Sequence, residues 1–188
     1  MDELRMLSLS DLSKTDEQAT KLLVGIYSSA RKCIEKDGEC APLVLVYPVP
    51  QIVPEGELQT CVPLPVNEFM RNGHSKDELR RFINTLLTVE ETAAVAFISE
   101  AWTVMQETPA SDVAGALARV QRGESLAEHP DRTEIVMVTL YRRGKPAIVA
   151  HATLTHKPDK IGEVRILPNE NTTGRFADDA GGLDQPQH

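Results

Sequence analysis

The stretch from Ala93 to Met105 constrains the fold more than any other part of the sequence. Its side chains fall into two alternating sets, which are Val95, Phe97, Ser99, Ala101, Thr103 and Met105, and Ala94, Ala96, Ile98, Glu100, Trp102 and Val104. Both sets are mostly apolar, whereas a strand with one solvent-facing side alternates apolar and polar residues. We therefore expect a central strand that the rest of the chain covers on both faces.

A long amphipathic helix from about Thr15 to Asp37 is expected to supply one of these covers. Thr15 and Gln18 have the spacing of a capping box, and Gly38 supplies a natural stop. The apolar stripe is Ala19, Leu22, Leu23, Ile26, Tyr27, Ala30, Cys33 and Ile34. On this stripe Cys33 is expected to be a small core residue and not a nucleophile.

A second helix is expected from about Lys76 to Leu87. Ser75 and Glu78 have capping-box spacing, and the apolar face is Leu79, Phe82, Ile83, Leu86 and Leu87. A shorter helix is expected from Ser111, as its cap, to Gln121, although Gly115 lowers the helix propensity there.

Four further segments have the composition of strands. Leu43 to Tyr47 is apolar and β-branched, Glu134 to Tyr141 and Ala147 to Thr155 form a hairpin, and Glu163 to Leu167 is a last short strand. Six of the twelve prolines lie between residues 42 and 65, which predicts an extended arm after the first strand. Such an arm is either a docking segment or an irregular connection on the domain surface, and we favour the connection.

This order of elements predicts an α+β fold: a mixed, largely antiparallel sheet of four to five strands with two main helices packed on it. The first strand–helix–strand unit leaves room for a parallel crossover. Residues 1–167 are expected to form a single domain. Residues 168–188 contain little to bury and are expected to be a disordered acidic tail.

Charge and cysteine content limit the classes of function. The 20 basic and 28 acidic residues give a net charge of −8, which makes nucleic acid an improbable partner, and the sequence has no apolar stretch long enough to cross a membrane. Residues 141–165 carry 6 basic and 2 acidic side chains, so they are either an anion-binding patch or, as we favour, a hairpin that balances the acidic body. Three cysteines without a signal-peptide pattern suggest a cytoplasmic protein with free thiols.

The candidate site residues are Glu100, Trp102, His129, Asp131 and Arg132. Alternation puts Glu100 and Trp102 on one face of the central strand, where a buried carboxylate needs a partner. We hypothesise a structural latch in which Arg132 pairs with Glu100 and Trp102 covers the pair. In the same hypothesis Asp131 caps the turn before the next strand.

The alternative hypothesis is a metal-dependent hydrolase. Glu100, His129, Asp131 and His151 would then hold a divalent ion that activates water. The sequence has no HExxH motif and no paired cysteine spacing typical of zinc sites, so we expect no metal, no cofactor and no catalytic residue.

The expected function is therefore that of a small soluble binding or accessory protein with a protein partner. The metal-dependent hydrolase remains the runner-up. Strand edges also leave a homodimer open, while no membrane association is expected.

Overall fold

The computed structural model describes residues 7–49, 61–71, 73–104, 112–156 and 160–167 of the 188-residue chain. In chain order the elements are β1 (Leu7–Ser8), α1 (Leu9–Ser13), α2 (Glu17–Asp37), β2 (Leu43–Pro48), β3 (Val62–Pro65), the 3-10 helix η1 (Asn67–Met70), α3 (Gly73–Thr88), β4 (Thr92–Thr103), α4 (Val113–Gln121), β5 (Thr133–Arg142), β6 (Lys145–Thr155), β7 (Lys160–Ile161) and β8 (Arg165–Leu167). The expected tail at 168–188 lies outside the described residues.

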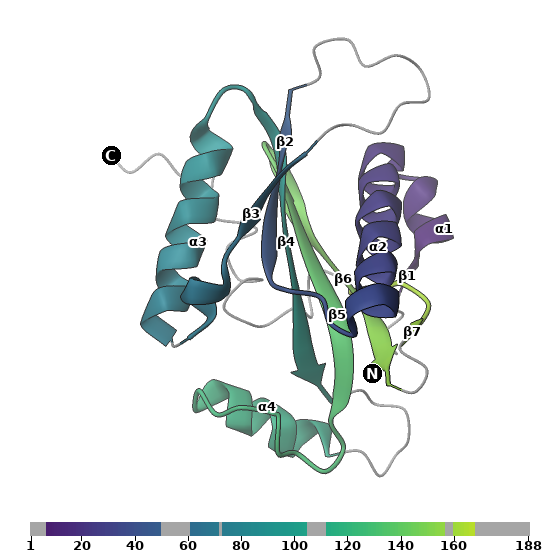
Figure 1. Ribbon diagram of the computed structural model, residues 1–188, viewed down its shortest axis with the longest axis vertical. Helices are drawn as coiled ribbons and strands as arrows, with labels where there is room; N and C mark the ends of the chain where they lie inside the picture. The colour runs from purple at the N-terminus through teal and green to yellow at the C-terminus, as the bar shows by residue number, and fades with distance from the viewer. Residues whose placement is uncertain (1–6, 50–60, 72, 105–111, 157–159, 168–188) are drawn as a thin grey trace.

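The fold is α+β, with one sheet between two helical layers (Figure 1). Its strand order is β1-β8-β6-β5-β4-β2-β3, with β7 paired to β6, and every described pair is antiparallel. The sheet has eight strands, so the predicted four to five were too few. The antiparallel pairing of β2 with β4 also rules out the parallel crossover.

The central strand is confirmed. β4 lies between β2 and β5, and its two faces belong to two separate cores. Ala94, Ala96 and Ile98 pack in the core under α2, while Val95 and Phe97 pack in the core under α3. Layers on both faces explain why both faces of this strand are apolar.

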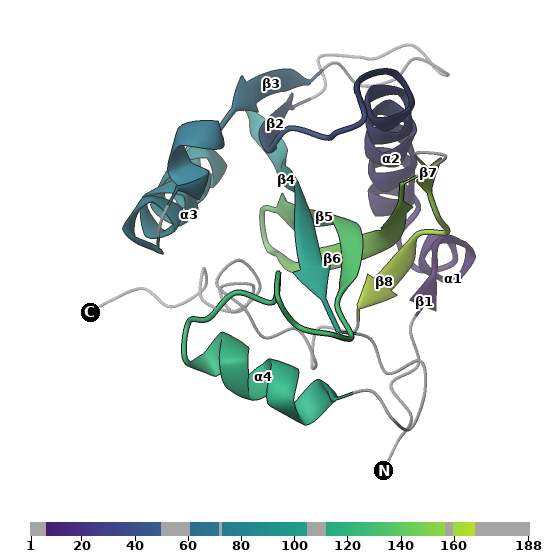
Figure 2. The ribbon, with the colours of Figure 1, turned by 60° about the horizontal axis from the view of Figure 1, so that its bottom comes forward.

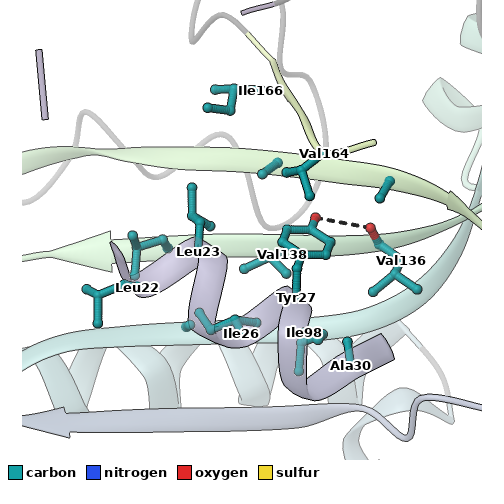
Figure 3. Packing of buried hydrophobic residues seen from close by; sticks show 14 of the residues in the cluster. Leu22, Leu23, Ile26, Tyr27, Ala30, Ile98, Val136, Val138, Val164 and Ile166 are labelled. Carbon is teal, nitrogen blue, oxygen red and sulfur yellow. Dashed lines mark hydrogen bonds between the residues drawn. The ribbon is translucent and has the colours of Figure 1, made fainter. Parts of the chain in front are cut away.

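Helix α2 is held at both ends and along its buried stripe. Asp16, one residue from the predicted cap, accepts a hydrogen bond from Ala19 N at 3.0 Å, and Gly38 ends the helix with a φ of 77°. The stripe packs on β4 and β5, and the Tyr27 hydroxyl donates to the Val136 carbonyl at 3.2 Å (Figure 3). The prediction that Cys33 is a core residue was wrong, because Cys33 is exposed at the edge of the stripe. Cys40 is buried instead.

Helix α3 covers the opposite face of the sheet. Its residues Leu79, Ile83 and Leu87 are buried, as the apolar spacing predicted. The helix begins at Gly73, so Ser75 lies inside its first turn and is not the cap residue.

The proline-rich arm contains an edge strand that was not predicted. Val66 N donates to the Pro42 carbonyl, and alternate backbone N–H groups of a strand point the same way, so those of Leu64 and Val62 also face β2. Pro63 and Pro65 therefore occupy the outward positions, where this edge offers no N–H donor. The opposite edge, β1, has two residues.

The two arginines of the basic hairpin between β5 and β6 contact other parts of the same chain. Arg142 donates to Asp16 at the start of α2, at 2.6 and 2.9 Å, and Arg143 donates to the carbonyls of Leu87 and Val89 at the end of α3. The turn thus fastens one helix on each face of the sheet, and Arg142 is buried in doing so, whereas the favoured interpretation was a solvated hairpin. None of the described helices is long and apolar enough to cross a membrane.

Candidate functional site

Glu100 lies on β4 two residues after Ile98, and therefore on the same face of the strand, which α2 covers. Its Oε1 accepts a hydrogen bond from the backbone N of Cys40 at 2.5 Å. Cys40 is buried just after α2, and burial raises the pKa of its thiol to about 11, which makes it a poor nucleophile. The Glu100 carboxylate therefore ties the chain leaving α2 to the central strand.

Arg132 has a different partner from the one expected. Its guanidinium carbon lies 5.0 Å from the centre of the Trp102 ring, which is a cation–π distance. No hydrogen bond or ion pair joins Arg132 to Glu100 in the part of the chain that the structure describes. The predicted ion pair is thus wrong: a backbone N–H satisfies the carboxylate, and an aromatic face receives the cation. Trp102 therefore contacts Arg132 and does not cover a Glu100–Arg132 ion pair.

His129 and Asp131 form a cluster with Asp112, the residue that caps α4. Asp112 Oδ1 accepts from Gly115 N at 2.8 Å, and Asp131 Oδ2 accepts from Asp112 N at 3.0 Å. His129, only 4% exposed, accepts from Asp131 N through Nδ1 at 3.2 Å and places Nε2 3.8 Å from Asp112 Oδ2. Asp131 therefore does act as a cap, but at the start of α4 and not at the turn before β5.

These contacts do not bring the candidate metal ligands together. Nδ1 of His129 is occupied by a backbone N–H, and Glu100 is bound to Cys40. Register places His151 beside Met137, on the face opposite Glu100. Among the described residues no group of three or more His, Cys, Asp or Glu side chains is arranged to hold a metal ion.

No known protein family matches the chain, and neither does any curated protein or solved structure.

The most exposed part of the candidate site is the end of β4. Trp102 is 38% exposed, and Glu134, directly opposite it on β5, binds His156 at 2.9 Å. Both figures of the whole chain place α4 at this end of the sheet, where β4 ends and β5 begins (Figures 1 and 2). Leu117 and Val120 of α4 are exposed as well. The candidate residues thus divide into a structural cluster at His129 and an open surface at Trp102.

Sequence reasoning missed a second feature, a hollow of about 250 Å³ where β1 and α1 meet α2. Arg31 and Glu163 are among its lining residues. It was missed because β1 and α1 are too short to show a hydrophobic period.

Replacing His129 with alanine is expected to lower the free energy of unfolding by about 1–2 kcal/mol, because Asp131 N loses its acceptor in this partly buried hydrogen bond. Hydrogen exchange should also speed up in α4, since the cluster fixes its first turn. The matched control is His74→Ala on the exposed surface of α3, expected to change little. Unchanged exchange in α4 would contradict the anchoring role of His129.

Proposed function

We propose that this chain is a non-catalytic binding domain that docks a protein partner around Trp102 and Arg132. The observation that carries the proposal is the exposure of the chain's single tryptophan, with an arginine stacked on its ring. Tryptophan and arginine are the residue types most enriched among those that dominate binding energy at protein interfaces. Tryptophan is highly buried on average, so a ring that is 38% exposed leaves apolar surface for a partner to cover.

The contact between Arg132 and the Trp102 ring holds both side chains in place before a partner binds. The guanidinium restricts the orientation of the indole, which reduces the ordering cost when a partner covers it. The Arg132 side chain makes no hydrogen bond to any other described residue, so its N–H donors remain available to a partner. Helix α4, whose Leu117 and Val120 are exposed, lies at the same end of the sheet (Figure 2).

The charges nearby favour a basic partner. Asp131 precedes Arg132 in the chain, Glu134 lies directly opposite Trp102 on β5, and Glu100 lies two residues before Trp102 on β4, so the sequence and register neighbours of the pair are acidic. The chain as a whole carries −8. We therefore commit to a partner segment in which lysine or arginine flanks an apolar anchor, and not to a nucleic acid.

The single tryptophan makes the test direct, because its emission comes from the proposed surface. We expect a peptide with lysines flanking a phenylalanine anchor to shift the emission and bind with a dissociation constant on the order of 10–100 µM, more weakly at high salt. The same peptide with glutamates in place of the lysines should not bind. Arg132→Ala should weaken binding about tenfold, and Val62→Ala at the far sheet edge is the matched control.

A comparison of captured proteins completes the test. The full chain, its Trp102→Ala variant and the Val62→Ala control are used as baits under identical conditions. A partner that the wild type and the control retain, and that the Trp102→Ala bait loses, supports the proposal. A partner retained by all three baits, or equal binding of both peptides, would overturn it, as would the absence of any peptide binding.

No observation in the described residues favours the metal-dependent hydrolase at Glu100, His129 and Asp131. Its test is ion analysis of the purified protein, in which a stoichiometric divalent ion would revive that alternative.

A further inference from the structure

The hollow beside α2 has a mostly apolar wall. Leu9 of α1, Val24 and Tyr27 of α2, and Val164 before β8 line it, and Val164 lies beside the Tyr27 ring (Figure 3). Val24 is half exposed, so part of this wall is open to a ligand. The volume of about 250 Å³ is below the ~300–1,000 Å³ of pockets for drug-sized molecules, so the ligand must be small.

The rim of the hollow carries one cation and one anion. Arg31 donates through Nη2 to the Gly162 carbonyl at 3.1 Å, which fixes the guanidinium at the rim and leaves its other N–H groups for a ligand. Glu163, the next residue after Gly162, also lines the hollow. No ion pair or hydrogen bond joins Arg31 to Glu163 in the described structure, so the two charges face the same space without neutralising each other.

We propose that this hollow binds a small zwitterion with an apolar body, namely a free aliphatic α-amino acid. The ligand carboxylate pairs with Arg31 and its ammonium pairs with Glu163. The aliphatic side chain lies over Val24 and Leu9. Ser10, which also lines the hollow and whose hydroxyl bonds that of Ser8 at 2.7 Å, supplies a further hydrogen-bonding group.

The combination of charges selects this class over the nearest alternatives. A simple fatty acid has no use for the Glu163 carboxylate, and an aliphatic amine has none for Arg31. A phosphate-bearing ligand would meet one guanidinium together with Glu163 and the nearby Asp11 carboxylate, which binds the rim residue Ser8. A molecule with both charges and an apolar side chain satisfies every group at the rim.

The binding is expected to be weak and sensitive to salt. Arg31 and Glu163 are both exposed, so water screens each ion pair. We expect dissociation constants in the high micromolar to millimolar range for leucine.

The test uses the full chain and three ligands that share one aliphatic skeleton. Leucine carries both charges, 4-methylpentanoate has the carboxylate alone, and 3-methylbutylamine has the ammonium alone. In amide chemical-shift titrations we expect leucine to move signals of α1, of α2 around Val24 and of residues 162–164. The two single-charge compounds should bind about tenfold more weakly.

Variants then assign each charge. Glu163→Gln should reduce leucine binding to the level of 4-methylpentanoate, and Arg31→Gln should reduce it to the level of the amine. Lys32→Gln and Glu35→Gln, exposed neighbours on α2, are the matched controls and should leave binding unchanged. Because Arg31→Gln also removes the bond to Gly162, Val24→Asp is a second variant that blocks the apolar wall without touching that bond.

Loss of leucine binding in Val24→Asp and Glu163→Gln, with both controls intact, supports the site. Equal binding of the three compounds, unchanged binding in Val24→Asp, or no shifts with millimolar leucine would overturn it. None of these outcomes depends on Trp102, so this inference and the proposed function stand or fall separately.

Discussion

Replacing Arg142 with alanine is expected to lower the free energy of unfolding by about 3–5 kcal/mol, because it leaves the partly buried Asp16 carboxylate without its cationic partner. The Arg142 side chain is 7% exposed and that of Asp16 is 18% exposed, with a shortest distance of 2.6 Å. The same carboxylate caps α2 through Ala19 N, so its loss of a partner acts on the helix as well as on the hairpin.

Chemical denaturation at neutral pH measures this loss. The matched control is Arg122→Ala, which removes a similar bidentate contact to Glu124 on the open surface, and it should lower the free energy of unfolding far less, because water screens that pair. Equal effects of the two substitutions would show that burial does not strengthen the Arg142 pair.

The same pair predicts the acid limb of the stability curve. The hydrogen bond from Arg142 lowers the pKa of Asp16 below its usual 3.8, so the folded protein holds this proton less tightly than the unfolded chain does. The stabilisation is therefore complete above pH 3.8 and is lost as the pH falls through the lower folded value. In Arg142→Ala this acid limb should be shallower.

The regular elements could be predicted because their signals are local. The stripe of α2 and the two apolar faces of β4 follow directly from periods of 3.6 and 2 residues, and the structure confirms both elements. The pairing of β3 could not be predicted in this way. Pro63 and Pro65 argue against a strand unless it lies at an edge with both prolines turned outward, and that is known only when β2 is placed beside it.

The candidate site shows a second limit of sequence reasoning. The partner of Glu100 is the backbone N–H of Cys40, a group that every residue except proline has, so no residue type marks it. Gly115 did carry a signal that was misinterpreted as weak helix propensity. A Cβ at this position would lie 2.0 Å from Asp112 Oδ2, so any larger residue would force the capping carboxylate to shift.

His151→Leu is expected to stabilise the protein, although most substitutions in a core destabilise it. His151 is 4% exposed, and neither ring nitrogen has a hydrogen-bond partner among the described residues. A buried polar group without a partner costs about 1–3 kcal/mol, which an apolar side chain of similar size does not incur. We expect a gain of this order at neutral pH, measured by chemical denaturation.

The gain should grow as the pH falls. Burial lowers the pKa of His151 below 6.5, and the charge of Arg165, its neighbour on β8, lowers it further. The unfolded chain therefore binds this proton more readily, so wild-type stability decreases from about pH 6.5 down to the folded pKa, and His151→Leu should remove that decrease. His74→Leu, on the exposed surface of α3, is the control and should keep the decrease. A loss of stability in His151→Leu at pH 8 would instead mean that the neutral ring makes a favourable polar contact, and the sheet face that holds it would then be the place to look for a bound group.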